Sequence, residues 1–152
     1  MAGLQDDIQL LSSVPLFAGM SDDQLRLVAF GAERRRLSPG QALFREHAPA
    51  ECAYIVADGA IDLTITGRDG KPELRETVPA GTLLSEIALI TLVERKYTAT
   101  ARGDAEVLRI TRALFQRLME EYPPVAAMVQ GRLKQNLAAM VEGIGALERY
   151  FG

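Results

Sequence analysis

The pattern of apolar and polar positions divides the chain into helical ends and a β-rich middle. Residues 4–12 place leucine and isoleucine at helical spacing, which predicts a short N-terminal helix. A second helix is predicted from Ser21, because Gln24 three residues later completes a capping-box pattern. The expected buried set of the first helix is Leu4, Ile8, Leu10 and Leu11.

From about residue 33 to 111 the chain consists of short segments rich in β-branched and aromatic residues, separated by Gly, Pro and Asp. Residues 60–66 alternate with period two, as a half-buried strand requires. Asp69-Gly70 indicates a hairpin turn, because glycine accepts the positive φ that such turns need. We predict strands at 34–37, 42–45, 52–57, 60–66, 73–78, 97–102 and 106–110.

Helical patterning returns near the C-terminus. Residues 112–120 carry one apolar side, the pair Pro123-Pro124 interrupts the pattern, and one long helix is expected from about Val125 onward. This helix carries a heptad seam formed by Leu133, Leu137, Met140, Ile144, Leu147 and Phe151. The seam has two interpretations: packing on the domain itself, or a helix pair that joins two copies. We favour the second, a homodimer through the C-terminal helix.

These elements predict one domain over residues 1–152 of the α+β class, mostly β with flanking helices. Residues 1–32 form N-terminal helices, 33–111 a jelly-roll β-barrel (double-stranded β-helix, or β-roll), and 112–152 C-terminal helices. A length of 152 residues suits one such domain. The residues expected to face the roll interior are Ile55, Ile61, Leu63 and Ile65. Their aliphatic character argues against a β-roll enzyme, whose interior would be polar.

Charge and segment composition narrow the choice of partners. The net charge of −3 and the pI of about 5.2 argue against nucleic acid as a partner. Arg34, Arg35 and Arg36 form the only basic run, which we expect to be a solvated strand edge. Neither a signal peptide nor a membrane-spanning run is recognisable, so we expect a cytoplasmic protein without a membrane partner.

The sequence contains one cysteine and one histidine, which limits the possible chemistry. Cys52 has no second cysteine with which to form an intramolecular disulfide. Because His47 is the only imidazole, a histidine-rich metal site is excluded, and we expect no metal. No catalytic signature surrounds either residue, so we expect a protein that is not an enzyme, with His47 in a loop.

The most informative residues lie in two short runs, 81–90 and 95–101. Glu86 is expected at the start of a short apolar helical turn, and Arg95 follows nine positions later, where the chain returns to strand. Backbone N–H groups at the start of such a turn bind anions. An arginine guanidinium clasps a phosphate with two parallel hydrogen bonds, and a glutamate accepts one from a sugar hydroxyl. Together these residues suit a ligand with one phosphate and a ribose.

This arrangement resembles the phosphate-binding cassette of cyclic-nucleotide-binding domains, as in the catabolite activator protein and protein kinase A regulatory subunits. The resemblance covers about residues 10–145. The positions that match the cassette pattern are Glu86, Ala88, Leu89, Arg95, Thr98 and Ala101, and the upstream matches are Pro39-Gly40, Tyr54-Ile55-Val56, Gly59 and Gly81.

The resemblance implies a role for each part of the cassette. Glu86 would hold the ribose 2′-hydroxyl, Arg95 the cyclic phosphate, and the backbone of Ile87 and Ala88 would donate to that phosphate. The complete set of expected ligand-binding residues is Leu84, Ser85, Glu86, Ile87, Ala88, Arg95, Lys96, Tyr97 and Thr98. Polar residues of the last helix that would cap the base are Gln130 and Lys134, with Gln135 as a third.

Three positions depart from the family pattern. Ser85 replaces the cassette glycine, Lys96 a small or hydroxylated residue, and Tyr97 an alanine. Because Lys96 lacks the hydroxyl associated with cyclic GMP, the resemblance favours cyclic AMP as the ligand. The expected function is a non-catalytic sensor that signals by rearranging its C-terminal helix. The alternative is a degenerate, ligand-free roll that serves as a dimerisation or docking module.

The catabolite activator carries a helix-turn-helix after its C-terminal helix. Here the sequence ends at Gly152 with no basic recognition helix. If the sequence is the whole protein, we expect a sensor that acts through an effector protein rather than through DNA; if it is part of a longer chain, the effector could belong to the same chain.

Overall fold

The structure, a computed structural model, describes residues 3–142. The helical elements are α1 (Leu4–Ser12), η1 (Pro15–Phe17), α2 (Asp22–Gly31), η2 (Glu86–Leu89), α3 (Arg112–Glu121) and α4 (Pro123–Glu142). The strands are β1 (Glu33–Leu37), β2 (Ala42–Phe44), β3 (Pro49–Ala50), β4 (Cys52–Asp58), β5 (Ala60–Thr66), β6 (Pro72–Pro79), β7 (Leu83–Leu84), β8 (Val93–Glu94), β9 (Thr98–Ala101) and β10 (Ala105–Thr111). All seven predicted strands are present, and the pattern missed the two-residue strands β3, β7 and β8.

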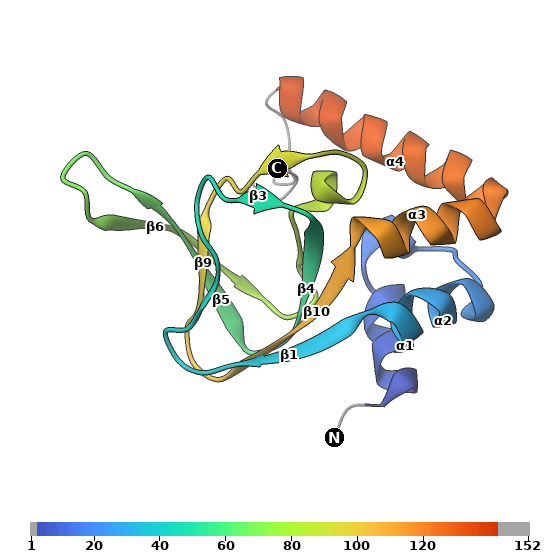
Figure 1. Ribbon diagram of the computed structural model, residues 1–152, viewed down its shortest axis with the longest axis horizontal. Coiled ribbons are helices and arrows are strands. Elements are labelled where there is room, and N and C mark those ends of the chain that lie inside the picture. Colours follow the sequence, from blue (N-terminus) through green and yellow to red (C-terminus); the bar gives the residue numbers. More distant parts are fainter. Residues whose placement is uncertain (1–2, 143–152) are drawn as a thin grey trace.

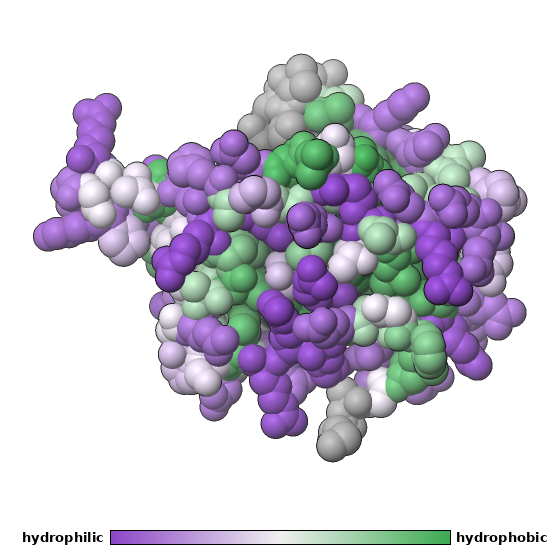
Figure 2. Space-filling view, in the orientation of Figure 1, coloured by the Kyte–Doolittle hydropathy of each residue, from purple (hydrophilic) through white to green (hydrophobic). Residues whose placement is uncertain are grey.

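Two antiparallel sheets enclose the roll, with strand orders β1-β10-β4-β7 and β2-β9-β5-β6. Strands β3 and β8 form a small third pair. The helices α1 to α4 gather on one side of the roll, and α4 runs across α3 (Figure 1). The β5–β6 hairpin projects from the opposite side, and its outer surface is hydrophilic (Figure 2). The predicted mostly-β class with flanking helices is therefore confirmed.

Strand β4 separates two hydrophobic cores. All five residues from Cys52 to Val56 are buried, because both faces of the strand are covered. Tyr54 and Val56 belong to the cluster inside the roll, together with Ile61 and Leu63 as expected. The prediction for Ile55 was wrong: this residue belongs to the cluster under the helices. Alternation along β4 places it on the opposite face from Tyr54.

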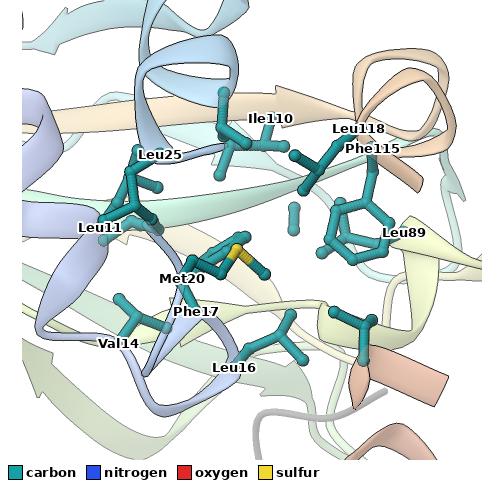
Figure 3. Packing of buried hydrophobic residues seen from close by; sticks show 14 of the residues in the cluster. Leu11, Val14, Leu16, Phe17, Met20, Leu25, Leu89, Ile110, Phe115 and Leu118 are labelled. Carbon is teal, nitrogen blue, oxygen red and sulfur yellow. The ribbon is translucent and has the colours of Figure 1, made fainter. Parts of the chain in front are cut away.

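The second core lies between the helices and the outer face of β4 and β10. In Figure 3 side chains from η1, α1, α2, α3 and η2 converge there. Phe17 and Phe115 meet edge to face, with ring centroids 6.3 Å apart. Ile8 and Leu11 of α1 are buried as expected and Leu10 is partly buried, but Leu4 is 39% exposed, contrary to the prediction. Leu4 is the first residue of α1 and lies outside this cluster.

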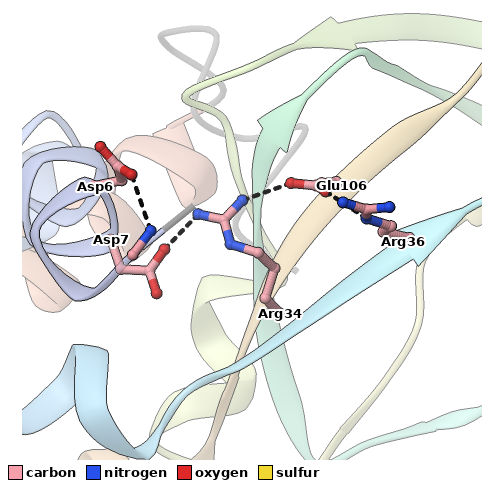
Figure 4. Close-up of polar contacts among 6 residues, drawn as sticks. Asp6, Asp7, Arg34, Arg36 and Glu106 are labelled. Atoms are coloured by element: carbon pink, nitrogen blue, oxygen red, sulfur yellow. Dashed lines mark hydrogen bonds and ion pairs between the residues drawn. The ribbon is translucent and has the colours of Figure 1, made fainter. Parts of the chain in front are cut away.

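The arginine run on β1 is only partly the solvated strand edge that we expected. Arg35 and Arg36 have largely exposed side chains, but that of Arg34 is only 23% exposed. Arg34 forms ion pairs with Asp7 of α1 and, at 2.8 Å, with Glu106 of β10, and Glu106 also accepts from Arg36 (Figure 4). The pair between Arg34 and Asp7 connects α1 to the roll. The hydrogen bonds that Glu106 accepts lower its pKa, and the bond from Arg34 has the largest effect.

The capping box at Ser21 is confirmed, since its hydroxyl accepts from the Gln24 amide and the Gln24 side chain accepts from the Ser21 amide. Helix α4 begins at Pro123, two residues earlier than predicted, because proline suits the first helical turn. No helix between residues 3 and 142 is long and apolar enough to span a bilayer.

The described residues of the heptad seam on α4 differ in burial. Leu133 is buried in the helical core, whereas Leu137 is 41% exposed. The side chain of Met140 and residues Ile144, Leu147 and Phe151 lie outside the part that can be described. The first contact of the seam is therefore with the domain itself, and pairing with a second copy stays a prediction.

Candidate ligand-binding site

The cassette leaves the roll at β7 and returns at β9. Leu84 pairs with Tyr54 of β4, so the segment starts from the edge strand β7 of the sheet. The chain then turns at Ser85, forms the short helix η2 from Glu86 to Leu89, and pairs again as β8. The expected sequence of helical turn, loop and strand is thus present.

Ser85 adopts the left-handed conformation, with φ 64° and ψ 45°, and is buried. A side chain in this region costs roughly 1–2 kcal/mol, which explains why a glycine would suit the position. The turn is nevertheless made with serine, so the departure from the family pattern leaves the backbone path in place.

Glu86 is a buried carboxyl with a partner on α4. Its residue is 8% exposed, and its Oε2 accepts a hydrogen bond of 2.7 Å from the side-chain amide of Asn136. Burial raises the pKa of Glu86, and the hydrogen bond from Asn136 opposes that shift. Sequence reasoning missed Asn136, because it is one of several polar residues in this part of α4 and no local signal distinguishes it.

Arg95 is also buried, at 4% exposure, but it is held by the roll. Its guanidinium donates to the Cys52 carbonyl at 2.9 Å and to the Cys52 Sγ at 3.3 Å. The Phe44 ring lies 4.4 Å and the Tyr54 ring 5.4 Å from its Cζ atom, in cation–π geometry. A guanidinium has five N–H donors, so these two hydrogen bonds leave donors for a ligand phosphate.

The backbone around Arg95 is equally fixed. Its amide donates to the Ala48 carbonyl, and its carbonyl accepts from the amide of His47, each at 2.8 Å. His47 is exposed, with φ 71°, in the loop that sequence reasoning assigned to it. This pairing sets the position at which the Arg95 side chain enters the roll.

The backbone donors of η2 are less available than expected. The amide of Ala88 already donates to the Ser85 carbonyl at 3.0 Å. The Ala88 carbonyl accepts from Arg112, which also donates to the carbonyls of Ala50 and Thr91. Arg112 therefore anchors the cassette to the start of α3, a role that no local pattern indicated.

The remaining predicted site residues are spread over the surface, the roll interior and the helical core. Lys96 is exposed, with its Nζ 5.7 Å from the centre of the Tyr97 ring. Tyr97 is half-buried and packs on the roll interior, and the Thr98 hydroxyl accepts from the Glu46 amide. Ile87 packs on the helical core. Gln130 and Lys134 are exposed on α4, and a role for them in base capping stays a prediction.

Glu86 and Arg95 face different cavities. Glu86 lines a cavity of about 430 Å³ that is bounded by η1, residues 81–83 and α4. Arg95 lines a cavity of about 330 Å³ at the roll, together with Tyr54 and Arg109. Within residues 3–142 Glu86 and Arg95 form no ion pair with each other, and the two side chains expected to hold one ligand line separate cavities. In the same range no group of His, Cys, Asp or Glu side chains has metal-site geometry.

Comparison with known proteins shows the same fold and family features elsewhere. The family model described as cyclic nucleotide-binding domain matches residues 34–122. The structure of a cyclic nucleotide-binding-like protein from Brucella abortus is 44% identical, with a TM-score of 0.70, covering 76% of this chain and 98% of that one. The N-terminal domain of a transcriptional regulator from Streptomyces coelicolor is 25% identical, with a TM-score of 0.81, covering 88% and 94%.

Longer proteins contain a similar segment. The cyclic AMP receptor protein of Thermus thermophilus is 28% identical over 84% of this chain, which spans 55% of that protein. The chain spans only 8% to 9% of the fungal lysophospholipases that it also matches. The resemblance therefore covers one segment and not the whole of these relatives.

Proposed function

Because this chain belongs to the cyclic nucleotide-binding domain family, we propose that it is a non-catalytic sensor of cyclic AMP whose signal is a rearrangement of α4. Arg95 binds the cyclic phosphate and Glu86 the ribose hydroxyl. Because the two side chains line different cavities in the structure, one nucleotide reaches both only when η2 and α4 rearrange. Preference for cyclic AMP over cyclic GMP is supported by the likeness to the Thermus receptor and by Lys96, which lacks a hydroxyl.

The hydrogen bond from Asn136 to Glu86 carries the mechanism. It connects the carboxylate that would hold the ribose directly to α4. A ribose hydroxyl that donates to Oε2 of Glu86 competes with Asn136 for that oxygen. Ligand binding thus replaces a contact of α4. The population with α4 displaced rises only by as much as the ligand binds that state more tightly than the other.

Isothermal titration of the nucleotide-stripped protein tests this function. We expect saturable binding of cyclic AMP, weaker binding of cyclic GMP, and loss of both in Arg95→Ala. Arg95→Lys keeps the charge but loses the planar guanidinium, so its nucleotide affinity should lie between those of the wild type and Arg95→Ala. Absence of heat and of thermal stabilisation at millimolar nucleotide would overturn the proposal.

A second candidate function is a ligand-free docking or dimerisation module. It is supported by the burial of Arg95 against Cys52, Phe44 and Tyr54, which already stabilises the guanidinium without any ligand. This alternative predicts that no nucleotide binds and that Arg95→Ala affects stability alone. The titration above separates the two functions.

As partners of the sensor we propose a second copy, through α4, and an effector protein, within the cytoplasm. The exposed Leu137 supports the dimer, because it continues the seam beyond the buried Leu133. Light scattering of wild type and Leu137→Lys tests this: the variant should be monomeric and the wild type dimeric. Equal masses would contradict the dimer.

A further inference from the structure

The cavity of about 430 Å³ lies on the helical side of the molecule, outside the roll interior. Its apolar wall consists of Val14, Pro15, Leu16 and Leu83. Val14 and Leu16 belong to the helical core and Leu83 packs against it, whereas the neighbouring Leu84 faces the roll. Its volume falls within the range of roughly 300–1,000 Å³ typical of small-molecule sites.

The opposite wall is polar and comes from Glu86 and from Arg132, Gln135 and Asn136 of α4. Two of these residues, Arg132 and Asn136, attach α4 to the rest of the domain. Arg132 donates to the carbonyls of Pro15 and Leu16, at 3.3 and 2.9 Å, and Asn136 donates to Glu86. The cavity therefore lies between two attachments of one helix.

The lining indicates the chemistry of an occupant. An apolar body would cover Leu16 and Leu83 and release poorly bound water. At the Glu86 end of the cavity an anionic group is disfavoured, because it would meet the buried carboxylate. A neutral hydroxyl can donate to Glu86, whose described hydrogen bond uses only Oε2.

The geometry points to a second small-molecule site in this cavity, for a compact apolar molecule that carries a hydroxyl at one end. Asn136 both lines the cavity and binds Glu86, so occupancy changes the affinity of the nucleotide. This coupling rests on the proposed function; the site itself does not. By linkage, the nucleotide changes the affinity of the second ligand by the same factor.

A fluorinated probe tests the site directly. The fluorine resonance of 4-fluorobenzyl alcohol, titrated into the nucleotide-stripped protein, should shift and saturate. 4-Fluorotoluene should bind about fivefold more weakly, the equivalent of one net hydrogen bond. 4-Fluorobenzoate should also bind more weakly, because its charge faces Glu86.

A pair of variants on α4 locates the binding. Gln135→Trp places an indole at the rim of the cavity and should abolish the saturable shift. Ala127→Trp adds the same group to an exposed residue of the same helix that does not line the cavity, and should leave binding unchanged. Circular dichroism melting confirms that both variants fold. Lack of saturation in the wild type, or equal binding by both variants, overturns the site.

The coupling is measured separately, as the cyclic AMP affinity with and without saturating probe. A changed affinity supports coupling through Asn136 and Glu86, and an unchanged affinity overturns it. If the stripped protein binds no cyclic nucleotide, the proposed function fails while the probe titration keeps its own result.

Discussion

Glu86 and Arg95 are the two buried charges of the cassette, yet the molecule holds them in different ways. Arg95 is fixed by the roll, through a backbone carbonyl of β4 and two aromatic rings. Glu86 is satisfied by one side chain of α4. The first set of contacts persists as long as the β-roll is folded, whereas the second depends on where one helix lies.

This difference suits the two roles of a sensor. A phosphate site must be in place before the ligand arrives, because a preorganised site loses less entropy on binding. A signalling contact must instead be replaceable by the ligand. Removing Arg95 should therefore lower both the stability of the fold and the nucleotide affinity. Changes at Glu86 and Asn136 should instead affect stability and affinity differently.

The largest effect is expected for Arg95→Ala. Loss of a charged hydrogen-bond donor and of the cation–π contacts should lower the free energy of unfolding by roughly 2–4 kcal/mol. Nucleotide binding should disappear as well. Denaturant unfolding and titration measure the two effects, with Arg109→Ala, in the same cavity, as the matched control. An unchanged stability would show that the roll does not depend on this arginine.

Asn136→Ala should move stability and affinity in opposite directions. The buried Glu86 would lose its partner, which costs about 1–3 kcal/mol of stability. Nucleotide affinity should rise, because the ribose hydroxyl no longer competes with the amide. Arg132→Ala, which removes another polar contact of α4 but leaves the hydrogen bond to Glu86, serves as the control in the same titration. A lower affinity in Asn136→Ala would contradict the competition mechanism.

The pH dependence of stability distinguishes Glu86 from an ion-paired carboxylate. Burial raises the folded-state pKa of Glu86, so the folded protein binds this proton more tightly than the unfolded chain. The contribution of Glu86 to stability therefore falls as pH rises from about the ordinary value of 4.5 through the raised pKa. Glu86→Gln should remove this fall.

Glu106 provides the opposite case, because its ion pairs lower its folded-state pKa. Its contribution is present above the ordinary value and is lost as pH falls through the lowered pKa. Thermal melting of wild type, Glu86→Gln and Glu106→Gln between pH 3 and 8 compares the two (roughly the range over which carboxyl groups titrate). If both variants change the pH dependence of the melting temperature in the same direction, the pKa shift assigned to one of the two carboxyls is wrong.

The smallest effect is expected for Ser85→Gly. Glycine relieves the left-handed strain but gains freedom in the unfolded chain, so the net change should stay within about 1 kcal/mol. Ser85→Val should be clearly destabilising, because a β-branched residue tolerates positive φ poorly. Melting temperatures of the two variants measure this contrast. Equal values would mean that the turn does not require its present backbone.

Much of the fold could be predicted from local pattern. Period-two alternation in 60–66, the Asp69-Gly70 turn and the Ser21 capping box are local signals, and each element is present. The two-residue strands β3 and β8 could not be predicted, because pairing across the chain creates them. Ile55 was assigned to the wrong face for a similar reason: a strand buried on both sides has no polar face to orient the pattern.

For the site, the sequence by itself determined the chemistry and the order of the groups: a glutamate at a turn, an arginine nine positions later, and a strand after it. Only the tertiary structure decided the partners. Asn136 lies 50 positions from Glu86 and Cys52 lies 43 positions from Arg95. Local spacing specifies which backbone conformations are favourable, but contacts over such separations arise only when the roll closes around Arg95 and α4 packs over Glu86.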